Sequence, residues 1–220
     1  MLIKNATILT CDARGTILSG DVQIRNGRIS ALGPDLPDDG GETLDARGKL
    51  LLPGLIQSHL HLCQTGFRGI AEDLELLPWL RDKIWPAEAT LTPESTYSSA
   101  KLGIQELLQT GVTTVCTMES VQHTEAVFEA CREMGIRAVV GKALMDRGEG
   151  VPKELLQSAD EALIELEELY ARYHGAEGGR LRCAAAPRFG LSCSPELLRD
   201  AADFARQKSI LLHTHASENP

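Results

Sequence analysis

Features that would define a membrane, disulfide-rich or dinucleotide-binding protein are missing from this 220-residue chain. No stretch approaches the roughly 18 uninterrupted apolar residues of a membrane span, and the first residues lack the apolar core of a signal peptide. The six cysteines are scattered without a Cys-x-x-Cys pair, which favours reduced thiols. No Gly-x-Gly-x-x-Gly or P-loop motif follows any predicted strand. The sequence therefore predicts a cytoplasmic protein that does not enter a membrane.

Excess positive charge is missing too, because the formal net charge is -9. A chain of this sign has no general electrostatic attraction for nucleic acid or for an anionic membrane. The hydrophobic fraction of 43% is ordinary, and the length suffices for one large domain or two smaller ones. We expect a small-molecule partner, and the sequence leaves open whether the chain forms a homo-oligomer.

The first part of the chain, residues 1–52, has the pattern of a small β domain. Its central signal is Asn26-Gly27, a turn dipeptide that favours a tight hairpin. Alternating or apolar runs that predict strands lie at residues 2–9, 21–25, 28–32, 43–45 and 49–51. We expect a small β-sandwich segment that packs against another part of the molecule.

From residue 53 to residue 220 the pattern changes to strands that alternate with helices, which predicts a parallel sheet. The predicted strands are residues 55–61, 112–117, 136–144, 181–186 and 209–216. The predicted helices are residues 92–110, 124–134, 155–170 and 194–208, and residues 62–91 form one long connection. The fold class is thus α/β, the N-terminal part of a (β/α)₈ TIM-type barrel with about five strands. An open doubly wound sheet has the same local alternation.

Histidines stand at the ends of the first and fifth of these strands. His59 and His61 are spaced i, i+2, so their side chains project to the same face of a strand. His213 and His215 repeat this spacing, and Glu218 follows them. Neutral imidazole is a common metal ligand, and chemistry in such barrels lies at the C-terminal ends of the strands. The pattern favours a metal hydrolase site over two pairs of ordinary strand histidines.

These motifs together resemble the amidohydrolase superfamily, in particular its purine deaminase and chlorohydrolase branch. The resemblance is carried by residues 53–61 (PGLIQSHLH) and by His215-Ala216-Ser217-Glu218, behind a small β domain. It implies that His59, His61 and His215 bind one divalent metal ion, with Zn²⁺ favoured and Fe²⁺ possible. It also implies that Glu218 shuttles protons. The family ligand is the histidine three residues before this glutamate, so we expect His213 to be a hydrogen-bonded interior residue.

The implied chemistry suits these residue types. A bound divalent metal lowers the pKa of its water and produces hydroxide near neutral pH. The hydroxide attacks the ring carbon that bears an amino group, and Glu218 accepts a proton and delivers it to the ring nitrogen and the leaving ammonia. The resemblance thus implies an aminohydrolase that deaminates a purine or an adenosine derivative, with a 5'-deoxyadenosine-like nucleoside favoured.

Two sets of residues indicate different substrates. Gln64, Arg188 and Phe189 resemble the base-contacting residues of guanine deaminases. In contrast, Trp79 and Glu88 lie in motifs that resemble deaminases of adenosine derivatives, in which a glutamate at the Glu88 position accepts hydrogen bonds from ribose hydroxyls. A guanine deaminase or a triazine-type chlorohydrolase is therefore the alternative.

Departures from the S-adenosylhomocysteine deaminase pattern favour a smaller substrate. Those enzymes carry histidine where this chain has Arg188, and arginine where it has Lys142. His123, near the end of the second predicted strand, is a further candidate for lining the pocket.

The family pattern also has a fourth histidine after a sixth strand and a metal-binding aspartate after an eighth. The sequence ends at Pro220, before either position. We therefore expect the N-terminal half of a deaminase, either a fragment or a short relative, with weak metal affinity and no measurable turnover by itself. A non-catalytic metal-binding half-barrel is the second alternative.

Overall fold

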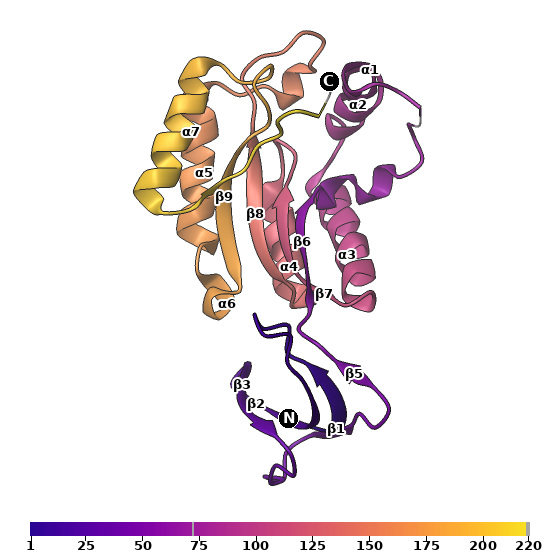
Figure 1. Cartoon of the computed structure of the whole chain (residues 1–220). Helices are drawn as coiled ribbons and strands as arrows, with labels where there is room; N and C mark the ends of the chain where they lie inside the picture. Colours follow the sequence, from indigo (N-terminus) through magenta and orange to yellow (C-terminus); the bar gives the residue numbers. More distant parts are fainter. Residues whose placement is uncertain (72, 219–220) are drawn as a thin grey trace. The chain divides into compact units, whose positions relative to one another are not determined.

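The computed structural model describes residues 1–71 and 73–218, so that Glu72, Asn219 and Pro220 lie outside the described residues. The chain divides into two compact units, Met1–Gly54 and Leu55–Pro220 (Figure 1). The sequence predicts a boundary after residue 52, and the contacts within the chain divide it after Gly54.

The sequence predicts a small β-sandwich segment for the first unit. In the structure this unit is one mixed five-stranded sheet. Its strands are β1 (Leu2–Leu9), β2 (Ile17–Arg25), β3 (Arg28–Gly33), β4 (Thr43–Asp45) and β5 (Leu50–Leu51). β1 pairs antiparallel with β2 and parallel with both β4 and β5. Asn26 and Gly27 both have positive φ, 51° and 70°, so this turn joins β2 to β3 as the sequence predicts.

The second unit is a parallel sheet whose spatial order follows the sequence. The strands are β6 (Leu55–Leu60), β7 (Val112–Met118), β8 (Arg137–Leu144), β9 (Leu181–Pro187) and β10 (Leu211–Leu212). Their order is β10-β9-β8-β7-β6, and every pair is parallel. This curled half-barrel sheet confirms the predicted N-terminal part of a TIM-type barrel.

Helices cover this sheet on its outer face (Figure 1). They are α3 (Pro93–Gln109), α4 (Thr124–Met134), α5 (Ala159–Tyr173) and α7 (Pro195–Lys208), with the short α6 (Ala176–Gly179) before β9. α3 packs against β7, α4 against β8, and α5 and α7 against β9. The apolar core lies between sheet and helices, with Ile104, Phe128 and Tyr173 among its large buried side chains.

The fifth strand is shorter than the predicted residues 209–216. Only Leu211 and Leu212 pair with β9, opposite Ala184 and Ala185. The amide of His213 still donates to the carbonyl of Ala185 at 2.9 Å. The next bond of a parallel ladder would come from the amide of residue 187, and Pro187 has no amide hydrogen. The described chain beyond Leu212 therefore forms no regular strand.

α5 begins later than predicted because a capping box fixes its start. The hydroxyl of Ser158 accepts a hydrogen bond from the amide of Glu161, and the Glu161 side chain accepts one from the amide of Ser158. Leu155, predicted as part of this helix, lies instead in a separate 3₁₀ turn, Lys153–Leu155.

Apart from Glu72, the long connection between β6 and α3 contains four short helical segments. They are η1 (Leu62–Phe67), α1 (Leu76–Trp79), η2 (Leu80–Ile84) and α2 (Trp85–Glu88). Leu80, Ile84 and Trp85 are buried against Met118 and Met145, at the ends of β7 and β8. The connection therefore packs over the C-terminal ends of the strands.

All six cysteines are free, in agreement with the expected thiols. None of the helices in residues 1–71 and 73–218 combines the length and the apolar character that crossing a bilayer requires.

Candidate metal centre and active site

Three histidines from the two edge strands of the sheet, β6 and β10, and the residues that follow them lie close together. His59 lies on β6, His61 directly follows it, and His215 lies three residues beyond β10. The Nε2 atom of His215 is 3.2 Å from Nε2 of His59 and 3.3 Å from Nε2 of His61. Potential ligand atoms of all three residues lie within 4.8 Å of one another. The structure thus brings together the three residues predicted as ligands.

Backbone carbonyls orient two of these imidazoles through the opposite ring nitrogen. Nδ1 of His61 lies 2.6 Å from the carbonyl oxygen of Met118, and Nδ1 of His215 lies 2.8 Å from that of Arg188. A carbonyl only accepts hydrogen bonds, so both Nδ1 atoms carry the proton. Burial, assisted by the charge of Arg188, lowers the pKa of His61 to about 3, so its ring is neutral. Its Nε2 therefore presents a lone pair to the cluster.

His213 contacts His59 on the side of the ring that faces away from the other two histidines. Its Nε2 lies 2.8 Å from Nδ1 of His59, the ring nitrogen that faces away from His215. Its Nδ1 lies 3.7 Å from Sγ of Cys116 on β7. His213 is thus hydrogen-bonded, as the sequence predicts, and lies outside the group of three convergent histidines.

One cavity of about 40 Å³ adjoins the histidines and collects most of the predicted site. Its lining residues come from β6 and η1, from the α1–η2 segment, and from the chain after β9 and β10. They are His61, Gln64, Leu76, Trp79, Leu80, Arg188, Phe189, His215 and Glu218. Seven of the nine residues predicted from the sequence are in this set, and His59 adjoins it through His215.

Besides His59, Glu88 is a predicted site residue that does not line the cavity. Its carboxylate is held by Arg188, with Nη1 at 2.6 Å from Oε2 and Nη2 at 3.1 Å from Oε1. Nε2 of Gln64 also donates to Oε1, at 2.6 Å. Both oxygens are therefore used by residues predicted to contact the substrate. The ribose contact predicted for Glu88 requires these bonds to rearrange, and it stays a prediction.

Glu119 is a buried acid in this region that the sequence reasoning missed. It follows β7 directly, and its two carboxylate oxygens accept hydrogen bonds from the amides of Leu62 at 3.3 Å and Cys63 at 2.8 Å. These amides begin η1, immediately after His61. Burial raises the pKa of Glu119 to about 7, against the opposing hydrogen bond from the Cys63 amide. An acidic residue two positions beyond a predicted barrel strand was the signal available for finding it.

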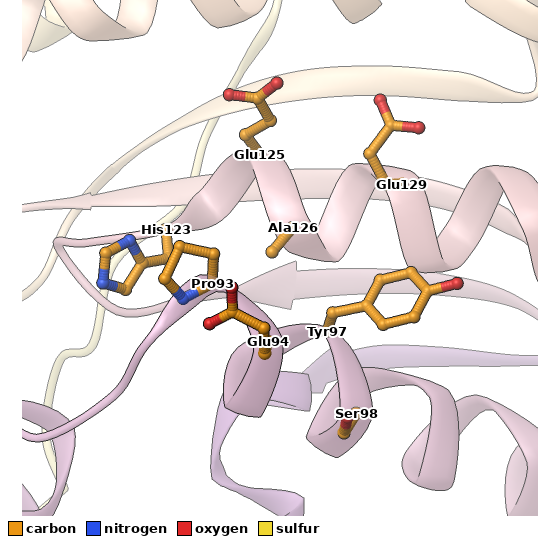
Figure 2. Close-up of a pocket in the computed structure, with 8 residues that line it drawn as sticks. All are labelled: Pro93, Glu94, Tyr97, Ser98, His123, Glu125, Ala126 and Glu129. Atoms are coloured by element: carbon orange, nitrogen blue, oxygen red, sulfur yellow. The ribbon is translucent and has the colours of Figure 1, made fainter.

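A larger cavity, of about 440 Å³, lies between the first turns of α3 and α4. Figure 2 shows Tyr97 and Ser98 on one wall, and Glu125 and Glu129 on the other. His123 lines this cavity and bonds through Nε2 to the carbonyl of Leu91 at 3.1 Å. His123 does not line the smaller cavity at His61 and His215. The larger cavity is therefore not the one that contains the predicted site residues.

A parallel half-barrel with convergent imidazoles at the ends of its first and fifth strands defines a candidate metal-dependent hydrolase. The chain belongs to the amidohydrolase family, whose model matches residues 50–220.

Known relatives are deaminases and a chlorohydrolase. The chain is 36% identical over 219 residues to a 5'-deoxyadenosine deaminase of Methanothrix thermoacetophila, covering 99% of this chain and 49% of the relative. It is 39% identical over 224 residues to a 5-methylthioadenosine/S-adenosylhomocysteine deaminase of Syntrophobacter fumaroxidans, with 100% and 49% covered. An atrazine chlorohydrolase of Arthrobacter aurescens complexed with zinc superposes with a TM-score of 0.89 at 29% identity, with 99% and 53% covered. The chain spans about half the length of these relatives.

Proposed function

We propose that this chain carries part of the active site of a metal-dependent aminohydrolase, with His59, His61 and His215 as ligands of one divalent ion. The supporting observation is the convergence of their Nε2 atoms. The Nδ1 atoms of His61 and His215 carry the protons, so two Nε2 lone pairs face each other at 3.3 Å. Facing lone pairs repel each other unless a cation lies between them.

The donor set fits zinc or iron. Tetrahedral zinc binds imidazole nitrogen at about 2.0–2.1 Å, which separates two ligand nitrogens by about 3.3–3.4 Å. The observed Nε2 separations are 3.2 and 3.3 Å. Imidazole suits both Zn²⁺ and Fe²⁺, and Zn²⁺ is favoured because the similar chlorohydrolase is complexed with zinc. When bound, such an ion activates water for nucleophilic attack near neutral pH.

The residues around the cavity supply binding and proton transfer. Glu218 is exposed and lines the cavity beside His215, where its carboxylate can hold a proton and pass it to a leaving amine. Phe189 and Trp79 offer apolar faces to an aromatic ring. Gln64 and Arg188 present polar groups at the same wall, fixed through Glu88.

The substrate we propose is a purine or an adenosine derivative, with a 5'-deoxyadenosine-like nucleoside favoured. Support comes from the two similar deaminases, whose names specify adenosine derivatives. Arg188, Phe189 and Gln64 support guanine as the alternative substrate, and the likeness to the atrazine chlorohydrolase supports a triazine. We further propose a cytoplasmic location, supported by the six free thiols, and leave open a homo-oligomer.

Metal content and ammonia release test this proposal separately. The 220-residue chain is dialysed to equilibrium against Zn²⁺ or Fe²⁺, so that a weakly bound ion is retained, and bound metal per chain is measured alongside His215→Ala. The histidine cluster predicts uptake of one ion by the wild type and loss of uptake in the variant. Ammonia release is then measured with the whole translated product of the gene on 5'-deoxyadenosine, adenosine, S-adenosylhomocysteine and guanine.

The two measurements separate the candidate functions. One ion bound without ammonia release from any purine would contradict the deaminase proposal and favour a triazine hydrolase, tested by chloride release from atrazine. An ion bound with no turnover on either class would favour the non-catalytic metal-binding protein. Uptake that is equal in wild type and His215→Ala would refute the ligand assignment itself.

A further inference from the structure

The three convergent imidazoles are not anchored in the same way. Carbonyl oxygens fix His61 and His215 as rings protonated at Nδ1. The partner of His59 is instead another imidazole, since its Nδ1 lies 2.8 Å from Nε2 of His213. One of these two nitrogens donates and the other accepts. The direction of this hydrogen bond therefore decides whether a neutral His59 ring carries its proton on Nδ1 or on Nε2.

We propose that His213 is a positioning residue that accepts a hydrogen bond at Nε2 from Nδ1–H of His59 and so keeps the Nε2 lone pair of His59 available to a divalent cation. The inference rests on the proposed function for the presence of that cation. Ligating histidines in proteins commonly donate their second ring N–H to such an outer partner, and loss of the partner typically weakens metal binding 10- to 100-fold.

The far side of His213 supports this direction of the hydrogen bond. A neutral ring that accepts at Nε2 carries its own proton on Nδ1. Here Nδ1 faces Sγ of Cys116 on β7 at 3.7 Å, and a thiol sulfur is a weak acceptor that can receive this proton.

The opposite direction has a specific consequence for His59. If Nε2 of His213 donated, Nδ1 of His59 would accept, and the single proton of a neutral His59 ring would lie on Nε2. That N–H would point at Nε2 of His215, 3.2 Å away, and occupy the position proposed for the cation. With a cation bound, Nε2 of His59 must be a lone pair and Nδ1 must carry the proton, so Nε2 of His213 has to accept.

The first test is long-range ¹H–¹⁵N NMR of the histidine rings in the 220-residue chain with Zn²⁺ bound. Ring ¹⁵N shifts distinguish a protonated from an unprotonated nitrogen. We expect both His59 and His213 to carry the proton on Nδ1, with Nε2 of His213 unprotonated. Protonation of His213 at Nε2 in the Zn²⁺-bound wild type would overturn the proposal.

The second test is Zn²⁺ affinity, measured by competition with a chelating indicator. His213→Leu should weaken binding 10- to 100-fold, and His213→Gln, whose side-chain oxygen can accept from Nδ1–H of His59, should recover part of the loss. His123→Asn is the matched control, because it removes a histidine bonded to a carbonyl outside the cluster. Asparagine also tolerates the φ of 63° found there. Equal affinity in the wild type and both His213 variants would refute the role.

The outcomes separate this inference from the proposed function. If neither the wild type nor His215→Ala takes up metal, the proposed metal site is wrong. If the wild type binds Zn²⁺ but Nε2 of His213 is protonated, only the role of His213 is wrong. If His213→Leu does not fold, as judged by circular dichroism, His213→Gln carries the affinity test and the wild-type spectrum carries the tautomer test.

Discussion

Arg188 and Glu88 form a bidentate ion pair in which 4% of the Arg188 side chain and none of the Glu88 side chain is exposed. Arg68 and Glu106 form a pair of the same geometry, at 2.7 and 2.9 Å, with about half of each side chain in water. The chain thus contains a buried and an exposed version of one interaction. The two pairs isolate the effect of burial.

Replacing Arg188 by leucine should destabilise the chain strongly, because Glu88 would then be a buried carboxylate without a cation. Breaking such a pair typically costs about 3–5 kcal/mol of unfolding free energy. Arg68→Leu should leave the free energy of unfolding nearly unchanged, since water solvates Glu106. Urea denaturation of the second unit, followed by fluorescence of Trp79 and Trp85, measures both.

The double variant Glu88→Leu/Arg188→Leu supplies the control. Removing both charges eliminates the unpaired carboxylate, so much of the stability lost in Arg188→Leu should return. A double variant as unstable as Arg188→Leu would show that packing of the arginine, rather than its charge, stabilises this region.

Glu119 should give the stability of the chain a specific dependence on pH. Burial raises its pKa from an ordinary value of 4.5 to about 7 in the folded chain. Between these values the folded chain keeps a proton that the unfolded chain has released. The stability that this proton contributes is therefore fully present below pH 4.5 and is lost as pH rises through 7. The loss is about 1.4 kcal/mol per pH unit across this window, and at most about 3.5 kcal/mol in total.

Glu119→Gln isolates this effect, because its amide resembles the protonated carboxyl and does not titrate. The free energy of unfolding is measured for the wild type and for Glu119→Gln at pH 5 and at pH 8. The value for the wild type minus the value for the variant should be smaller at pH 8 than at pH 5. The histidines titrate in both proteins, so their contribution cancels in the difference. A difference that is the same at both pH values would show that Glu119 is ionised throughout.

Local patterns predicted where the histidines lie because strand geometry fixes much of it. The i, i+2 spacing puts His59 and His61 on one face, and the ends of parallel strands bring His213 and His215 near them. The choice of His215 over His213 came from the family resemblance. The partners of these residues were not predictable in the same way. Met118 and Arg188 act through backbone carbonyls, which every residue type has.

The pairing of Glu88 with Arg188 was also beyond the sequence patterns. The two residues are 100 positions apart, and each was interpreted singly as a substrate contact. Their contact depends on how the segment between β6 and α3 packs over the strand ends, which short-range periodicity does not encode. In contrast, Ser158 and Glu161 form a local capping box that the sequence does contain.

Lys142 offers a test of a buried cation that does not contact the cavity. Its Nζ donates to the carbonyl of Val121 at 2.7 Å and to Gln157 at 2.9 Å, and pairs with Glu165 at 2.9 Å. Lys142→Met keeps the apolar stem but leaves a buried carbonyl unsatisfied, a loss of about 1–3 kcal/mol. Thermal or urea unfolding measures it.

The matched control for Lys142 is Lys101→Met. Lys101 pairs with Glu133 at 2.7 Å on the surface of α3 and α4, where water replaces the lost bond. Its effect on the free energy of unfolding should be much smaller. Equal losses in the two lysine variants would mean that the polar contacts of Lys142 contribute little.

Gly141 lies in the sheet behind the site, where neighbouring strands leave no room for a side chain. It lies on β8, and a Cβ atom there would be 2.6 Å from the carbonyl oxygen of Thr117 and 2.9 Å from Cβ of Ala186. Neither atom belongs to a flexible side chain, so Gly141→Ala forces β7 or β9 to move. We expect a loss of about 1–3 kcal/mol, typical of overpacking. Gly190→Ala, which adds its Cβ to open space, should be nearly neutral.

Gly141→Ala should also weaken metal binding, because Thr117 precedes Met118, whose carbonyl orients His61. Displacing β7 shifts that carbonyl and with it the direction of the His61 lone pair. Zn²⁺ affinity of Gly141→Ala should therefore fall relative to Gly190→Ala under conditions in which both variants are fully folded. Reduced stability with unchanged affinity would show that β9 moves and β7 does not, so that the backbone around His61 is more rigid than the sheet beside it.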